Sequence, residues 1–152
     1  MRQYVLLIPI SLRFLLVLKP KLQGIVLSIF VKKIFASLRT RAFEAGVITN
    51  QVDEKPGSLG VIQRFGSALN LNLHYHVLVT DGVFSLYTKS SLVAFHPLPK
   101  PSEFDLESIA HETCCAVIAL LRRDGLWIDE PCVEDLFQSL NENALAQSYR
   151  PA

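Results

Sequence analysis

The hydrophobic and polar positions change period along the chain, which predicts strands and helices in turn. Val, Ile, Leu and Tyr dominate residues 2–10, a composition typical of a buried strand, and a buried helical turn is expected after it. From Pro20 onward, apolar residues recur at steps of three and four, which predicts one face of a helix that ends near Gly46. The residues of that face are Leu22, Val26, Ile29, Phe30, Ile34 and Leu38.

The middle of the chain reads as a run of short strands. Residues 49–59 are polar and contain Pro56 and Gly57, which predicts a loop. Strands are expected over residues 60–65, 69–80, 83–87 and 92–95, with a turn at Asp81-Gly82. Three prolines at positions 97, 99 and 101 then predict a stiff connector.

Helical signals return in the last third of the chain. Ser102, with Asp105 three residues later, predicts a capping box, and Gly125 predicts the end of that helix. A final helix is expected over residues 131–146. The order of elements therefore predicts an α+β fold, an antiparallel sheet packed against helices, in a single domain over residues 1–152.

Composition narrows the class of protein. Half of the 152 residues are hydrophobic and 19% are charged, so the chain can form a core. The net charge of +1 does not by itself indicate a nucleic-acid-binding protein. Pro9 and Arg13 interrupt the apolar N-terminal stretch, which argues against a signal peptide or a membrane span. Three cysteines without a C-x-x-C pair predict reduced thiols in a cytoplasmic protein.

The expected strand over residues 69–80 contains the main candidates for functional residues. Because strand side chains alternate between two faces, the residues at odd positions from Leu69 to Val79 share an apolar face. His74 and His76 share the other face, on which Leu78 is the one apolar member. Two imidazoles at this spacing can bind one divalent metal ion. A bare His-x-His is a weak motif that fits equally well with two partly exposed polar residues.

Other candidate residues have simple structural interpretations. Lys21, Lys32 and Arg39 fall on one stripe of the expected helix, which suits contact with phosphates or a solvated face. His96 and His111 are expected to be structural and exposed, respectively. Trp127 could stack on a base but fits a core anchor better.

Beyond these patterns, several blocks resemble the two-tyrosine rolling-circle transposases of bacterial insertion sequences, which belong to the nucleases named for their His-hydrophobe-His (HUH) motif. The resemblance covers roughly residues 2–125, and the block that contains the two histidines is the most specific. The blocks are VIQRFGSALNLNLHYH (61–76), DGVF (81–84), RQYVL (2–6) followed by Pro9 and LRFLL (12–16), and FHPLP (95–99).

The resemblance implies an HUH nuclease-like fold and a reaction. His74 and His76 would bind magnesium or manganese, with Gln63 of a neighbouring strand as the candidate third ligand. The metal would hold the scissile phosphate of single-stranded DNA at transposon ends. A tyrosine would then attack the phosphorus and form a 5′-phosphotyrosine link, as in nucleophilic catalysis generally.

The chain departs from this family in two respects. Transposases of this family carry a cysteine-rich, zinc-binding segment before the block that corresponds to residues 2–6, and this sequence lacks it. They also carry a pair of catalytic tyrosines far downstream of the histidines. The tyrosines here are Tyr4, Tyr75, Tyr87 and Tyr149, none spaced as such a pair, so the catalytic residue stays unassigned. A truncated nicking and strand-transfer domain, inactive alone, is the leading hypothesis. The alternatives are a non-catalytic DNA-binding remnant and a metal-binding module unrelated to DNA.

Overall fold

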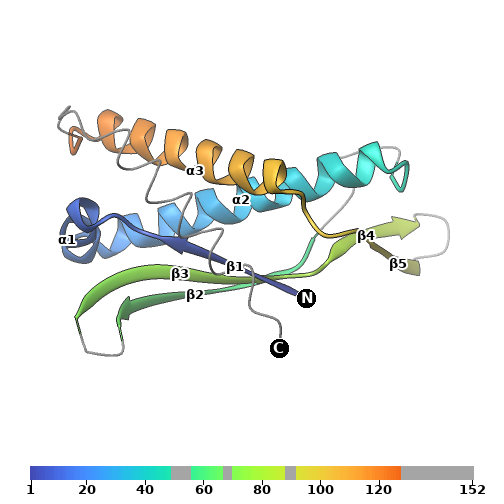
Figure 1. The fold of residues 1–152 in the computed structure, drawn as a ribbon, viewed down its shortest axis with the longest axis horizontal. Helices are drawn as coiled ribbons and strands as arrows, with labels where there is room; N and C mark the ends of the chain where they lie inside the picture. Colours follow the sequence, from blue (N-terminus) through green and yellow to red (C-terminus); the bar gives the residue numbers. More distant parts are fainter. Residues whose placement is uncertain (49–55, 67–69, 88–91, 128–152) are drawn as a thin grey trace.

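The computed structural model confirms the expected α+β class and describes residues 1–48, 56–66, 70–87 and 92–127. Strands and helices are mixed along this part of the chain, as Figure 1 shows. The strands are β1 (Arg2–Leu7), β2 (Ser58–Phe65), β3 (Leu71–Val79), β4 (Gly82–Tyr87) and β5 (Leu92–Pro97). The helices are α1 (Ile10–Leu18), α2 (Pro20–Glu44) and α3 (Glu103–Arg123).

Strand β3 is the centre of a three-stranded antiparallel sheet with the order β1-β3-β2. In its registers, Val5 and Val61 lie opposite His76 on either side, while Leu7 and Gln63 lie opposite His74. Strands β4 and β5 form a separate antiparallel hairpin. The central position of β3 surrounds both histidines with paired backbone, which fixes the direction of their side chains.

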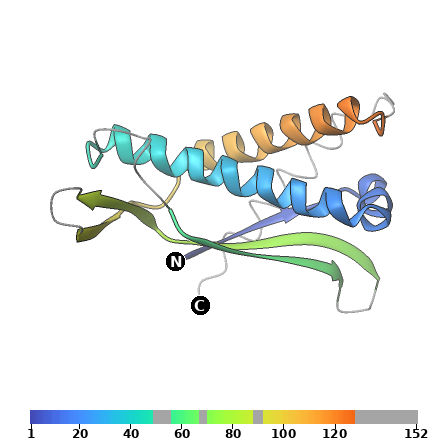
Figure 2. The same cartoon turned by 180° about the vertical axis from the view of Figure 1, so that it is seen from behind.

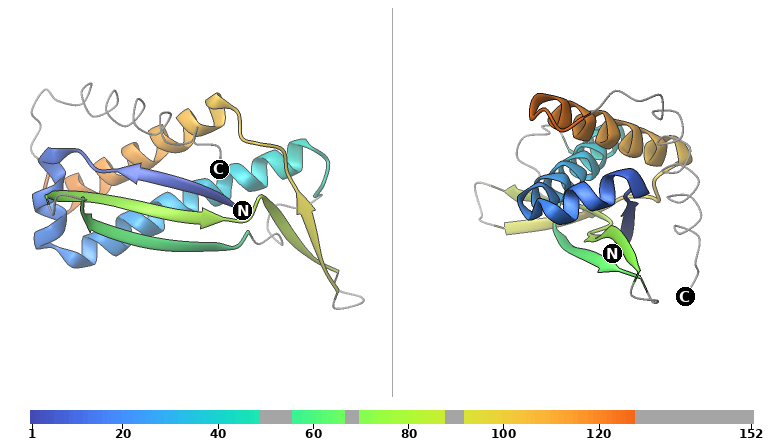
Figure 3. Two further views of the ribbon diagram at one scale, coloured as in Figure 1. Left: turned by 60° about the horizontal axis from the view of Figure 1, so that its bottom comes forward. Right: turned by 90° about the vertical axis from the view of Figure 1, so that its left-hand side faces the viewer.

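The helices cover one face of the sheet. In Figures 1 and 2, α2 lies over the sheet and α3 lies over α2, while the hairpin extends at the end of the molecule opposite α1. The turned views of Figure 3 show the other face of the sheet without a helix of the described residues on it. Packing against the sheet is close, since a Cβ added to Gly60 would lie 3.2 Å from the side chain of Leu27 on α2.

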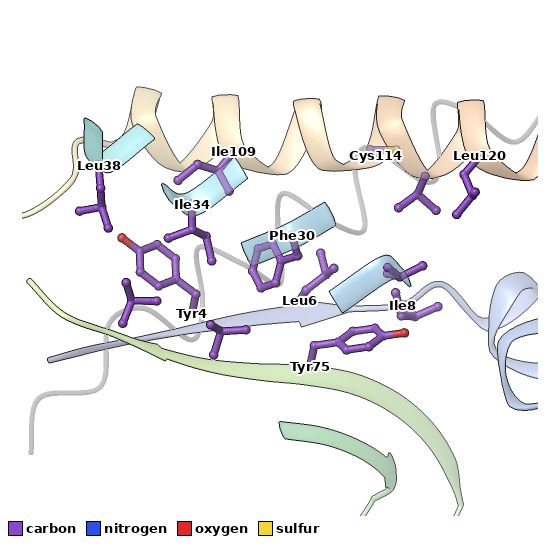
Figure 4. Close-up of a cluster of buried hydrophobic side chains, with 14 of the residues drawn as sticks. Tyr4, Leu6, Ile8, Phe30, Ile34, Leu38, Tyr75, Ile109, Cys114 and Leu120 are labelled. Carbon is purple, nitrogen blue, oxygen red and sulfur yellow. The ribbon is translucent and has the colours of Figure 1, made fainter. Parts of the chain in front are cut away.

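The core fills the layer between the sheet and the helices. Leu73, Tyr75 and Val77 of β3 point into it, and each is completely buried. Figure 4 shows Tyr4 and Tyr75 in this layer, beneath the helical side chains. The apolar face expected for the long helix is confirmed: Leu22, Val26, Phe30, Ile34 and Leu38 are buried, and Ile29 is partly buried.

Local helix signals are confirmed as well. Ser102 accepts a hydrogen bond from the backbone nitrogen of Asp105, whose carboxylate accepts one from Ser102 in return, so the capping box is complete. Gly46 and Gly125, each with φ of 65°, follow the last turns of α2 and α3 in the left-handed conformation that glycine adopts without strain. The expected helix over residues 131–146 lies outside the described residues.

Three expectations need correction. The turn expected at Asp81-Gly82 is a bend that leads directly into β4. Both edges of β3 are already paired with β1 and β2, so β4 pairs with β5 instead. His96 and Pro97 belong to β5 rather than to the connector. The N-terminal helical turn is a nine-residue helix that is only partly buried.

The exposed side of α1 has a geometric cause. Ile10, Phe14 and Leu18 recur every four residues and point outward together, whereas Leu16 is completely buried. A helix that packs on one side only cannot bury apolar residues that lie on its other side. None of the described helices combines the length and the apolar composition needed to cross a membrane.

Candidate functional site: a histidine pair on the open face of the sheet

His74 and His76 lie on the face of β3 that points away from the helices. Their ring centroids are 4.7 Å apart, with the planes at 68°. The same-face arrangement expected from strand alternation is therefore confirmed. His74 is more enclosed than expected, since only 8% of it is exposed, while His76 is half-buried.

The tautomer of neutral His74 follows from one hydrogen bond. Its Nδ1 lies 2.7 Å from the backbone carbonyl oxygen of Asn72. A carbonyl oxygen only accepts, so Nδ1 must carry the proton and donate it. Nε2 of neutral His74 then keeps a free lone pair, the state in which imidazole binds a metal ion.

His76 is held by a residue from the neighbouring strand. Its Nδ1 lies 2.6 Å from Nε2 of Gln3, which sits on β1 and reaches His76 diagonally across the strand pair. Partial burial, and then the neighbouring His74, lower the pKa of His76 below its ordinary value. The neutral form that binds metal ions is thereby favoured.

Gln63, the candidate third ligand, lies on the strand next to His74. It sits directly opposite His74 in the β2–β3 register. Its side-chain nitrogen donates to the carbonyl oxygen of Phe65 at 3.1 Å, a bond that does not use the amide oxygen. The oxygen is the atom through which an amide binds a cation, so this position is compatible with the role given to Gln63.

The donor set fits a weakly held divalent cation. Within the described residues, no group of three or more His, Cys, Asp or Glu side chains is placed to bind a metal ion. Two imidazoles and one amide oxygen would therefore leave room for water or a phosphate oxygen. Imidazole nitrogen suits manganese better than magnesium, which prefers oxygen ligands.

The surroundings of the histidines are mostly apolar. Leu59, Val61 and Leu78 lie on the same face and are 61%, 55% and 38% exposed. Apolar neighbours limit the hydration of a bound ion and strengthen its attraction to an anion.

The basic stripe lies on a different part of the molecule. Lys21 and Lys32 are exposed on α2, and Arg39 is half-buried there, whereas α2 packs on the face of the sheet opposite the histidines. The sheet therefore separates the stripe from the histidine pair. A DNA strand that contacts both would have to pass around the edge of the domain.

The described tyrosine side chains do not approach the histidines. Tyr4 and Tyr75 both point into the core on the opposite face of the sheet. Burial is the main cause that raises the pKa of both phenols, which disfavours the phenolate that a nucleophilic attack needs. The side chains of Tyr87 and Tyr149 lie outside the described part of the chain.

The remaining candidates lie away from the histidine pair along the chain, and His96 lies in β5 rather than in the expected connector. His96 Nε2 lies 2.7 Å from the hydroxyl of Ser85 across the β4–β5 hairpin. His111 is exposed on α3, and Trp127 is half-buried against the core. Cys114 and Cys115 are both free, and Cys132 lies outside the described residues.

Comparison with known proteins identifies one stretch. A family model described as "Putative transposase" matches residues 57–104. This stretch is transposase-related. It holds β2 to β5, with both histidines and Gln63, but not Gln3 or the basic stripe. No curated protein matches the chain, and no solved structure matches it either.

Gln3 is the site residue that the sequence did not point to. It is 73 residues away from His76 in the chain, and the two meet only through the β1–β3 register. An alternating pattern assigns a face to each residue within a strand, but it does not say which strands pair. The pairing of β1 with β3 was therefore needed to find it.

Proposed function

We propose that this chain is a transposase-related domain that binds single-stranded DNA at transposon ends through a divalent cation held by His74 and His76. The observation that carries the proposal is the histidine pair, with rings 4.7 Å apart on the open face of the central strand, inside the stretch that matches a transposase family. The resemblance to the two-tyrosine rolling-circle class supplies the expected substrate.

Each residue at the site has a definable task. His74, with Nδ1 bonded to the carbonyl of Asn72, presents Nε2 as a fixed donor. His76 supplies the second imidazole, and Gln63 the candidate amide oxygen. A bound manganese or magnesium ion would neutralise and polarise a phosphate oxygen of the DNA backbone. The exposed apolar residues Val61 and Leu78 border the place where a nucleotide would lie.

Strand cleavage requires a nucleophile from outside the described side chains. Tyr4 and Tyr75 are separated from the histidines by the sheet itself, and a nucleophile must approach the phosphorus to about 3–3.5 Å. This separation supports the second candidate function, DNA binding without cleavage. A denaturing gel of the protein incubated with labelled single-stranded DNA and manganese separates the two, because only cleavage by a nucleophilic side chain leaves labelled DNA covalently attached to the protein.

The binding test combines two titrations. We expect manganese binding by calorimetry in the native chain and none in the His74→Ala/His76→Ala double variant. Fluorescence anisotropy with a single-stranded hairpin should show that manganese strengthens DNA binding by roughly 10-fold, within the usual range for two linked ligands. Chelation with EDTA should remove that gain.

His111→Ala is the matched control, since it removes an exposed histidine of α3 and should change neither titration. Unchanged manganese binding in the double variant would overturn the metal site. Manganese binding without any effect on DNA affinity would support the metal-binding module unrelated to DNA.

A further inference from the structure

The contact between Gln3 and His76 has a property that the other contacts of the site lack. Gln3 carries both a donor, its NH2 group, and an acceptor, its carbonyl oxygen, at the two ends of one amide. The amide nitrogen of Gln3 lies 2.6 Å from Nδ1 of His76. A half-turn of the amide would bring its oxygen to the same place with little change in shape.

The two orientations dictate opposite tautomers of His76. When the amide nitrogen donates, Nδ1 must accept, so the proton of the neutral ring lies on Nε2 and that atom cannot bind a cation. When the amide oxygen faces Nδ1, the ring proton sits on Nδ1 and donates to it. Nε2 then has a free lone pair, as in His74.

His74 lacks this choice. Its partner is the backbone carbonyl of Asn72, which accepts in every state, so His74 is held permanently in the metal-binding tautomer. One histidine of the pair is therefore fixed, and the other depends on the orientation of a side chain from a different strand.

We infer that Gln3 is a positioning residue whose amide turns over when a cation binds, and so sets whether His76 presents a proton or a lone pair at Nε2. The part that concerns the cation rests on the proposed function, whereas control of the His76 tautomer by Gln3 does not. In the metal-free protein Nε2 carries the proton. On binding, that proton leaves Nε2, Nδ1 becomes protonated, and the Gln3 oxygen accepts from it.

Gln63 provides a matched comparison on the same face of the sheet. Its side-chain nitrogen donates a hydrogen bond to the backbone carbonyl of Phe65, and this bond involves neither imidazole. Gln3 and Gln63 are both exposed, so replacement of either by Met, which has a similar length, should leave the fold intact.

The test reads the tautomers directly. Long-range proton–nitrogen NMR spectra at about pH 8, where imidazole is neutral, identify the protonated nitrogen of each ring. Without metal, the native chain and Gln63→Met should show His76 protonated at Nε2. Gln3→Glu, whose carboxylate only accepts, should move the proton to Nδ1, and Gln3→Met should give a mixture of the two forms.

Zinc ion, which is diamagnetic, then serves as the probe for binding. On addition of zinc to the native chain, the His76 proton should move to Nδ1. Gln3→Met should bind zinc about 10-fold more weakly, the usual order for loss of a partner behind a ligand, and Gln3→Glu should restore the affinity. A structural role alone would not produce this rescue.

The outcomes are distinct. A His76 tautomer that is the same in Gln3→Met, Gln3→Glu and the native chain would overturn the inference. An effect of Gln63→Met on the His76 tautomer equal to that of Gln3→Met would overturn it as well. If no variant binds zinc or manganese, the proposed function fails, while a tautomer change in the metal-free Gln3 variants would still support the role of Gln3.

Discussion

Tyr75 and His76 are neighbours in the chain, yet their side chains lie on opposite faces of the sheet, Tyr75 completely buried beneath the helices and His76 on the open face. The hydroxyl of Tyr75 is buried without a hydrogen-bond partner among the described residues. A buried hydroxyl in this state costs free energy on folding, because it gives up its bonds to water.

Tyr75→Phe should therefore stabilise the protein by about 1 kcal/mol, the lower end of the cost of an unsatisfied polar group. Urea unfolding at equilibrium measures the change. Tyr75→Leu is the control, and it should lose about 2 kcal/mol or more because it leaves a cavity in the core. A loss of stability in Tyr75→Phe would mean that the hydroxyl has a partner after all.

Two glycines should respond to alanine in opposite directions. Gly24 lies within α2 with nothing within 4 Å of an added Cβ, so Gly24→Ala should raise the free energy of unfolding by roughly 0.5–1 kcal/mol. At Gly82 an added Cβ would lie 2.1 Å from the carbonyl oxygen of His96 and 2.8 Å from the ring of Phe95.

Gly82→Ala should thus force β4 away from β5 and lower stability by about 1–3 kcal/mol. Thermal unfolding of both variants and of the native chain measures whether each substitution raises or lowers the stability. An equally stable Gly82→Ala variant would show that the β4–β5 hairpin can relax without cost.

The adjacent cysteines should differ in their reaction with alkylating reagents. Cys115 is exposed, whereas Cys114 is buried, and burial followed by the neighbouring Cys115 raises the pKa of Cys114 to about 11. At about pH 8 only about one part in a thousand of Cys114 is thiolate, the reactive form. Iodoacetamide should label Cys115 first.

Tandem mass spectrometry locates the label on one of the two residues, and in denaturant both should react. Equal labelling of Cys114 and Cys115 in the native chain would contradict the burial of Cys114. Raising the pH toward 11 should narrow the difference, because the thiolate fraction of Cys114 then grows.

The basic stripe of α2 should affect DNA binding and metal binding differently. If Lys21 and Lys32 contact phosphates, Lys21→Gln/Lys32→Gln should weaken binding of single-stranded DNA. The slope of log affinity against log salt should become shallower by about 0.7 for each lost contact. Manganese binding should be unchanged, because the sheet separates the stripe from the histidines. Unchanged DNA affinity and slope would mean that the stripe is only a solvated face.

The sequence alone determined the features that depend on neighbours in the chain. Alternation from Leu71 to Val79 set the strand and put both histidines on one face, because the period of a strand is two and one face is buried. The Ser102–Asp105 capping box and the glycine after each long helix are equally local, since they satisfy backbone groups within a few residues.

Only the tertiary structure decided which strands pair and what each face meets. The pairing of β3 with β1 and β2 left no edge for β4, so the turn signal at Asp81-Gly82 produced a bend between two sheets. The same pairing brought Gln3 to His76 across 73 residues, and the packing of α2 put the basic stripe behind the sheet. Strand register and helix packing depend on the free energy of contacts between segments that are distant in the chain. A local pattern of residues therefore does not predict them.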